Sequence, residues 1–205
     1  MNNENQIGIG QQSDAKATST DNAKSRMNDS SNAPLKKFFV DALKDMLWGE
    51  KAITSSLKKL QNSVSNEELQ DAFQDHEFQT QKHIARLEKV FGLLGERADT
   101  KKCKALEGIL KEVDEMIEST PEGSATRDAV AIIGAQKVEH YEIACYGGLV
   151  AIAHTLGMTR AADLLQKSLE EEEQTDYDLT DIAECKINFE AKEEAEVKEP
   201  VEEKG

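Results

Sequence analysis

Apolar residues recur every three or four positions along four long segments of the chain, which is the spacing of one face of an α-helix. The first segment begins at Pro34, a residue that suits the first turn of a helix. One acidic residue interrupts its otherwise apolar face, which comprises Leu43, Met46, Glu50, Ile53 and Leu57. The pattern predicts a long helix that buries this face.

A second helix is predicted from about residue 65 to residue 94. Ser65 is followed three residues later by Glu68, the pattern of a capping box at a helix N-terminus. Two histidines and a glutamine interrupt the inward face of this helix, which comprises Leu69, Ala72, His76, Gln79, His83, Leu87, Val90 and Leu94.

Three more helices are predicted: a short one at about 102–119 and two long ones at about 123–156 and 159–187. Gly157 lies between the two long helices and suits the C-terminal cap of the first. The inward face of the third long helix comprises Ile132, Ala135, Glu139, Glu142, Tyr146, Leu149 and Ala153. That of the fourth comprises Ala161, Leu165, Ser168, Glu172, Asp176, Leu179 and Ala183.

These elements predict an all-α fold, a ferritin-like antiparallel four-helix bundle with one short extra helix in the middle connection. We expect the second and fourth long helices to run opposite to the first and third. The predicted globular unit spans residues 34–188. Residues 1–33 are rich in Asn, Ser and Gln and predict a disordered arm, whereas residues 189–205 predict a disordered acidic tail.

The charge of the chain argues against two classes of partner. The formal net charge is −15, which disfavours direct binding to nucleic acid or to an anionic membrane surface. The sequence contains neither a long apolar run nor a hydrophobic signal core, so we expect a cytoplasmic protein. Its three widely spaced cysteines predict reduced thiols and no disulfide framework.

Each long helix carries polar residues near the middle of its apolar face, and these positions could meet at one level of the bundle. Buried carboxylates cannot all remain ionised without a counter-charge, and a bound metal ion would supply one. Oxygen-rich ligands with an imidazole suit iron or manganese, and the set is large enough for two ions. The predicted ligands are Glu50, His76, Glu139, Glu142, Glu172 and Asp176.

Each candidate also has a simpler interpretation. Glu50 could point outward to solvent, and His76 could be an ordinary core histidine. His83 and His140 are assigned to structural or exposed positions, and Tyr146 is assigned to core packing. The metal hypothesis therefore depends on the coincidence of four helices rather than on any one residue.

Three segments carry a family resemblance: "EKAITSSLKKLQNSVSNEELQDAF", "AQKVEHYEIACYGGL" and "LEEEEQTDYDLTDIA". They resemble the YciE/YciF family of bacterial stress-associated ferritin-like proteins, over about residues 34–186. The resemblance implies a ferritin-like bundle, a homodimer and a metal site in the core. The family pattern has His-x-x-Glu-Thr in the second helix, where this chain has "HEFQT". Gln79 thus stands where the resemblance implies a bridging glutamate, as a neutral and degenerate substitute. The remaining candidates still suffice for two ions, but the substitution shifts the expectation toward one ion or none.

Two hypotheses about function follow. The first is an iron or manganese protein that handles peroxide or oxygen, or buffers iron, under stress. In it Glu50, Glu142, Glu172 and His76 coordinate, while Glu139 and Asp176 bridge or support. The alternative is a metal-free helical structural or interaction protein, which Gln79 favours. A storage cage or a DNA-protecting assembly is disfavoured because the chain is acidic.

Overall fold

The computed structural model describes residues 33–194, and the part of the chain it describes contains helices and no strand. The prediction of an all-α fold is confirmed. The helices are α2 (Pro34–Ser63), α3 (Glu67–Leu94), α4 (Lys104–Glu118), α5 (Ala125–Thr155), α6 (Thr159–Ile182), a π-helical segment (Ala183–Ile187) and α7 (Asn188–Glu193). The predicted disordered arm, apart from Ala33, and residues 195–205 of the predicted tail lie outside the described residues. Over residues 33–194, no helix combines the length and apolarity that a membrane span requires.

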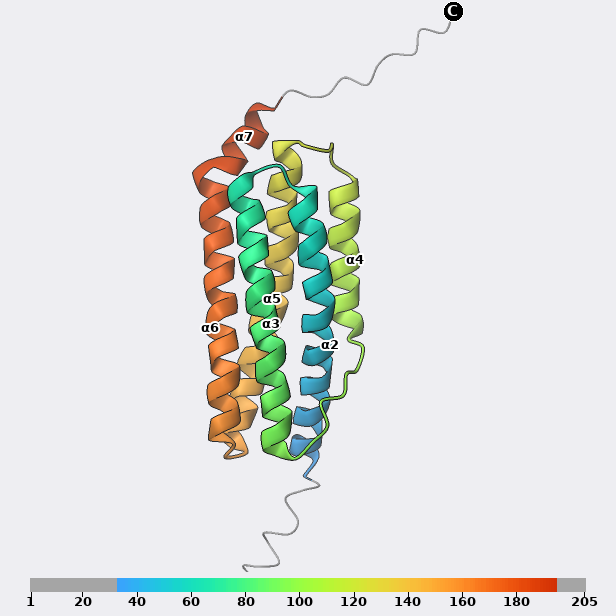
Figure 1. The fold of residues 1–205 in the computed structure, drawn as a ribbon, viewed down its shortest axis with the longest axis vertical. Coiled ribbons are helices and arrows are strands. Elements are labelled where there is room, and N and C mark those ends of the chain that lie inside the picture. Colours follow the sequence, from blue (N-terminus) through green and yellow to red (C-terminus); the bar gives the residue numbers. More distant parts are fainter. Residues whose placement is uncertain (1–32, 195–205) are drawn as a thin grey trace, which may run out of the picture.

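The four long helices α2, α3, α5 and α6 lie side by side, and α4 packs outside them against α5 and α2 (Figure 1). α2 and α6 run in one direction and α3 and α5 in the other, so the predicted pairing of directions is wrong. The reason is the connection at 95–124, in which α4 leads the chain back to the end of the bundle where α3 begins. Asp128 in the first turn of α5 accepts a hydrogen bond from the Ser65 backbone N–H at 2.8 Å, which fixes this arrangement.

The apolar interior forms two clusters, one toward each end of the bundle. One is built around Phe39, Leu47 and Phe91, and the other around Phe73 and Ile132. Each long helix passes from one cluster to the other at the polar residues that interrupt its apolar face. These residues therefore form a layer at mid-height, between two hydrophobic regions that exclude water.

Two helix ends test the capping predictions. The N-cap of α3 is Asn66, whose side chain accepts from Leu69 N–H at 3.1 Å, and the predicted capping role of Ser65 is wrong. Ser65 instead donates through its backbone N–H and its hydroxyl to Asp128. Gly157 follows α5 with φ 71°, and the Gly157 and Met158 N–H groups bond back to the last turn, so its prediction is confirmed.

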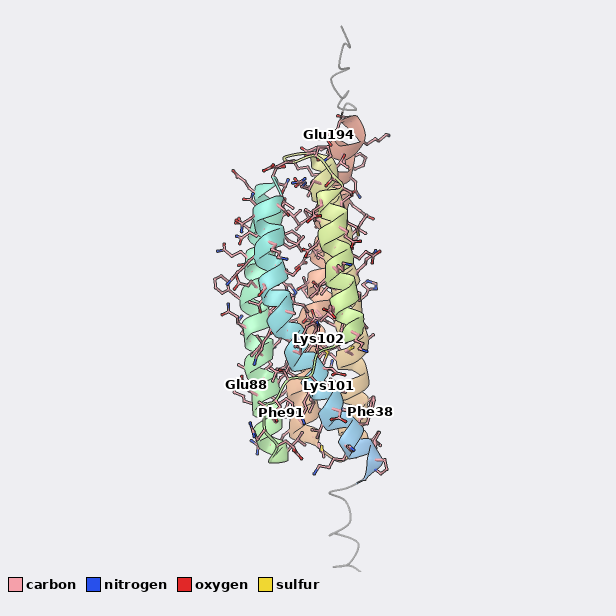
Figure 2. The ribbon with its side chains drawn as sticks, turned by 90° about the vertical axis from the view of Figure 1, so that its right-hand side faces the viewer. Phe38, Glu88, Phe91, Lys101, Lys102 and Glu194 are labelled. Carbon is pink, nitrogen blue, oxygen red and sulfur yellow. The ribbon has the colours of Figure 1, made fainter. Side chains whose placement is uncertain are left out.

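The helical structure continues past the predicted boundary at residue 188. α7 extends to Glu193, so the prediction of an unstructured tail is wrong for residues 189–193. The π-helical turn before it buries Ile187, which anchors this extension. Glu194 then accepts hydrogen bonds from the Ala125 and Thr126 N–H groups, both at 3.0 Å, and so caps α5 at the end of the bundle opposite Phe38 (Figure 2).

Candidate metal centre

Six ionisable side chains from the four long helices converge in the polar layer. None of them is more than 3% exposed. Because each comes from the middle of a long helix, packing at both ends of the bundle fixes its position. They are Glu50 from α2, His76 and His83 from α3, Glu139 and Glu142 from α5, and Glu172 from α6.

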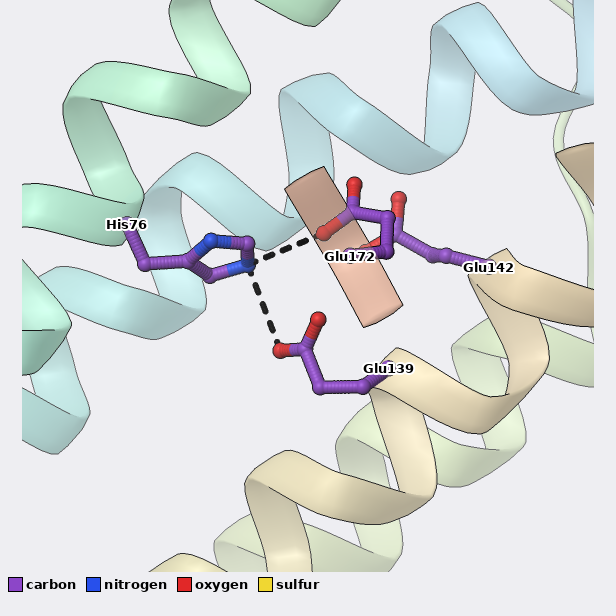
Figure 3. A group of neighbouring side chains, drawn as sticks. All are labelled: His76, Glu139, Glu142 and Glu172. Carbon is purple, nitrogen blue, oxygen red and sulfur yellow. Dashed lines mark ion pairs between the residues drawn. The ribbon is translucent and has the colours of Figure 1, made fainter. Parts of the chain in front are cut away.

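One group within the layer surrounds His76. One atom each from His76, Glu139, Glu142 and Glu172 lies within 4.8 Å of the others. His76 Nε2 lies 3.2 Å from Glu139 Oε1 and 3.6 Å from Glu172 Oε2 (Figure 3). This group offers one imidazole nitrogen and carboxylate oxygens from two further helices, which is a typical ligand set for iron or manganese.

A second group surrounds His83 and also satisfies the 4.8 Å spacing. His83 Nδ1 lies 2.8 Å from Glu172 Oε1 and 3.6 Å from Glu50 Oε1. Glu172 thus belongs to both groups and presents one oxygen toward each imidazole. A carboxylate in this position could bridge two ions.

The outward-facing nitrogen of each imidazole is also held. His76 Nδ1 lies 3.3 Å from Gln79 Oε1, and the Thr175 hydroxyl donates to the same oxygen at 3.3 Å. A proton on Nδ1 that is donated to Gln79 leaves the Nε2 lone pair of His76 directed at the cluster. Gln79 therefore contacts the far side of this imidazole and lies outside the group of candidate ligands.

His83 is oriented by a stronger partner. Its Nε2 lies 2.8 Å from Glu171 Oε2, and Arg86 donates to both oxygens of Glu171 at 2.6 and 2.7 Å. Burial would raise the pKa of Glu171, but Arg86 and His83 outweigh it and lower the pKa to about 2. An ionised carboxylate behind an imidazole fixes its orientation and strengthens its inner nitrogen as a ligand.

The inner atoms of the cluster make no hydrogen bond of normal geometry, although the two imidazoles lie within ion-pair distance of Glu172 and Glu139. Both oxygens of Glu142 are among them, and so are both oxygens of Glu172. Buried polar atoms normally have partners, so these atoms together form a set of donors that could hold a cation. The full set is Glu50 Oε2, His76 Nε2, His83 Nδ1, Glu139 Oε2, Glu142 Oε1 and Oε2, and Glu172 Oε1 and Oε2.

Two of the carboxylates, Glu142 and Glu172, bind a proton more tightly here than in water. Burial, and then the charges of Glu172, Glu50 and Glu139, raise the pKa of Glu142 well above its usual value. Burial raises the pKa of Glu172 to about 7, and the nearby His83 only partly opposes this shift. Removing either proton requires a positive charge close by.

The imidazoles provide such a charge when they are protonated. Burial alone would lower the pKa of His76, but Glu139 and then Glu172 raise it to about 9. Burial would likewise lower the pKa of His83, but Glu172 and then Glu50 raise it to about 10. The cluster therefore attracts cations, and protons are the simplest ones available.

The donor set fits two divalent ions. Four carboxylates with two neutral imidazoles carry a charge of −4, which two divalent cations would neutralise. The unsatisfied inner atoms, the shared Glu172 and the oriented imidazoles all agree with this composition. The residues present therefore fit the iron or manganese expected from the sequence.

The structure brings five predicted site residues together and leaves one outside. Glu50, His76, Glu139, Glu142 and Glu172 lie in the cluster, whereas Asp176 lies at the surface edge of α6. There Asp176 contacts Gln136 and His140, each at 3.2 Å. A step of four residues turns a helix about 40° past a full turn, and this rotation carries Asp176 away from the centre.

His83 and Tyr146 lie on the inward faces as predicted, but each also takes part in the cluster, a role that the sequence analysis did not assign. His83 is fully buried with a nitrogen directed at the cluster. Its signal was present, because a residue seven positions after His76 lies on the same helix face. Tyr146 packs in the core as predicted, but its hydroxyl also donates to Glu50 Oε1 and holds that carboxylate in place.

Comparison with known proteins identifies a matching family and a similar protein. The family described as Domain of unknown function (DUF892) matches residues 34–192. Protein YciF of Escherichia coli is 44% identical over 158 residues, which cover 77% of this chain and 95% of that protein.

Solved structures agree with this result. The crystal structure of the E. coli stress protein YciF has a TM-score of 0.71 and 41% identity, covering 75% of this chain and 97% of that one. YcfI of Rhodopseudomonas palustris, a proposed structural protein, has a TM-score of 0.70 and 34% identity, with 72% and 94% covered. A protein of Xanthomonas campestris shares the fold at a TM-score of 0.63 and 19% identity, with 77% and 97% covered.

Proposed function

This chain belongs to the DUF892 family, and because its buried cluster lies entirely within the matched residues 34–192, we propose that it is a stress-associated ferritin-like metalloprotein. In this proposal the cluster holds two iron or manganese ions and serves to handle peroxide or oxygen, or to buffer iron. The observation that carries the proposal is the set of inner nitrogen and oxygen atoms that are buried together without hydrogen bonds.

The roles of the residues follow from their positions. His76, Glu139 and Glu142 would hold one ion, Glu50 and His83 the other, and Glu172 both. A bound iron or manganese ion would supply a redox-active, Lewis-acidic centre.

The rest of the cluster prepares the donors for that ion. Tyr146 holds Glu50, Gln79 orients His76, and Glu171 with Arg86 orients His83. The two hydrophobic clusters exclude bulk water, which strengthens every charge interaction inside. When no ion is bound, the imidazoles and Glu142 hold protons that an entering ion must displace.

Metal analysis of the untagged protein tests this proposal. Protein purified without chelators, or reloaded with Fe(II) without oxygen or with Mn(II), should contain about two ions per chain. Glu172→Gln should reduce occupancy at both positions because Glu172 is shared, whereas Glu50→Gln should reduce it at one. Glu170→Gln changes an exposed neighbour of Glu172 and should leave occupancy unchanged. Protein that takes up neither metal would refute the proposal.

A second function is a metal-free helical structural protein. The observation in its favour is that protonated His76 and His83 can themselves compensate the carboxylates. The R. palustris relative is described as a proposed structural protein. This alternative requires that Glu142→Ala removes no metal and leaves stability equal or higher, whereas the metalloprotein loses bound ion in the same variant.

We also propose that the chain forms a homodimer, as its family resemblance implies, and that it is cytoplasmic. Sedimentation equilibrium of the full chain should give about twice the chain mass of 22.7 kDa. A mass of one chain at micromolar concentrations would refute the dimer and leave the metal proposal intact.

A further inference from the structure

A pocket of about 330 Å³ lies between α3 and α6 and reaches the metal cluster. Two members of the cluster, His76 and Glu139, form part of its wall. Both are almost fully buried, and His76 Nε2 and Glu139 Oε2 lack hydrogen bonds. The pocket therefore connects the buried donors with the outside of the bundle.

The outer part of the pocket is acidic. Glu68, Asp71 and Asp75 from α3 and Asp178 from α6 line it, and all four are exposed. No lysine or arginine is among the described residues that line this pocket. Several negative charges around a concave opening raise the local concentration of cations.

Two uncharged polar side chains, Gln79 and Thr175, line the pocket beside His76. The Gln79 Oε1 and Thr175 Oγ1 atoms each lie 3.3 Å from His76 Nδ1 and 3.3 Å from each other. These oxygens can replace part of the hydration shell of a cation. Because they carry no net charge, they would hold the ion only weakly, as a transit site requires.

We propose that the pocket between α3 and α6 is the route by which a divalent cation enters the cluster, with the four acids attracting it and Gln79 and Thr175 passing it inward. The proposal rests on the proposed function, because a route has meaning only if the cluster binds metal. It adds a specific role for four surface residues that do not contact the bound ion.

Stopped-flow measurement of Co(II) uptake by the metal-free full-length protein tests the route. Co(II) does not oxidise readily in air, and its visible absorption changes when it exchanges water for protein ligands. The variant Glu68→Gln/Asp71→Asn/Asp75→Asn/Asp178→Asn should take up Co(II) at least about ten-fold more slowly at low ionic strength. Its final stoichiometry should equal that of the wild type, since the cluster itself is unchanged.

Two controls separate the route from a general charge effect. Glu88→Gln/Glu118→Gln/Glu122→Gln/Asp163→Asn removes the same charge at exposed positions outside the pocket and should take up Co(II) within about two-fold of the wild-type rate. Raising the salt concentration to about 1 M should largely abolish the difference between pocket variant and wild type, because the screening length falls to about 3 Å. A charge reversal, Asp75→Lys/Asp178→Lys, also changes the net charge of the four acids from −4 to 0 and should slow uptake to a similar extent at low salt.

The outcomes are distinguishable. If the pocket variants load at the wild-type rate, or if the control set slows uptake equally, the route is refuted while the metal proposal stands. If the wild-type protein binds no Co(II), Fe(II) or Mn(II) at all, the metal proposal is refuted and the route with it.

Discussion

Glu142 keeps both carboxylate oxygens in the protein interior without a hydrogen bond. Its raised pKa means that folding of the metal-free protein favours the protonated form of this group, at a cost in free energy when the carboxylate is ionised. Glu142→Gln keeps the shape and removes this cost, so it should stabilise the metal-free protein by about 1–3 kcal/mol in urea unfolding at pH 7. The exposed control Glu170→Gln should change stability by less than about 0.5 kcal/mol. A destabilised Glu142→Gln protein would show that Glu142 is structurally required as an acid.

Gln79 supports the metal site through the outer nitrogen of His76. Gln79→Ala removes this partner and frees the imidazole to rotate, so the affinity of the His76 group for Mn(II) should fall about 10- to 100-fold. Gln79→Glu restores a stronger acceptor and should retain or increase that affinity. Competition titration with a metal indicator measures both. Equal affinity in all three proteins would show that Gln79 does not position His76.

At the level of single residues, helix periodicity is informative wherever a side chain lies at the centre of a face. It identifies Glu50, His76 and Glu172, which all lie at the mid-height layer. It fails at Asp176, which is rotated by about 40° around the axis of α6 relative to Glu172 and contacts Gln136 at the edge of that helix. Periodicity alone does not show how far from the centre of a face a residue remains buried, because this depends on how closely the neighbouring helices pack. The sequence also does not reveal that the Tyr146 hydroxyl bonds to Glu50, because the two residues lie on different helices.

At the level of elements, α4 packs closely against α5 because residue 134 is a glycine and has no side chain. A Cβ added at Gly134 in α5 would lie 3.0 Å from Val113 Cγ1 and 3.2 Å from Val113 Cγ2. Valine has a single favoured rotamer in a helix, so α4 would have to move. Gly134→Ala should therefore destabilise the protein by about 1 kcal/mol in urea unfolding, despite the higher helix propensity of alanine.

Two comparisons isolate this close approach. Gly108→Ala changes an exposed glycine in α4 with nothing within 4 Å, and it should stabilise by about 0.5–1 kcal/mol. In a Val113→Ala background the obstacle is removed, so the same Gly134→Ala change should become stabilising. A Gly134→Ala substitution that destabilises equally in both backgrounds would contradict the contact.

The lengths of the helices follow from the sequence, but their directions do not. An apolar face reads the same whichever way a helix points, so periodicity cannot show that α3 and α5 are parallel. That outcome depends on the 95–124 connection, whose short helix α4 carries the chain along the bundle.

The extension to Glu193 was missed for a related reason: its acidic residues are typical of a solvated tail, whereas Glu194 bonds to the start of α5.

At the level of the whole molecule, the buried layer links folding, protons and metal. Two imidazoles and Glu172 bind protons more tightly in the folded protein than at their ordinary pKa values of 6.5 and 4.5. The pKa of Glu172 rises to about 7, that of His76 to about 9 and that of His83 to about 10. These groups are also the candidate ligands, so protons and a metal ion compete for the same nitrogen and oxygen atoms.

The metal-free protein should therefore lose stability as the pH rises. Over the range from the ordinary to the folded pKa values, about pH 5 to pH 10, the folded state holds more protons than the unfolded state. The free energy of unfolding must then fall with pH across that range. The lowered pKa of Glu171 acts in the opposite sense, but only in acid, between its ordinary 4.5 and about 2. In protein loaded with Mn(II), the ion replaces these protons, so the free energy of unfolding should depend much less on pH. Urea unfolding at pH 5.5, 7.5 and 9, with and without Mn(II), measures this difference. Parallel profiles with and without Mn(II) would mean that the ion binds somewhere other than this layer.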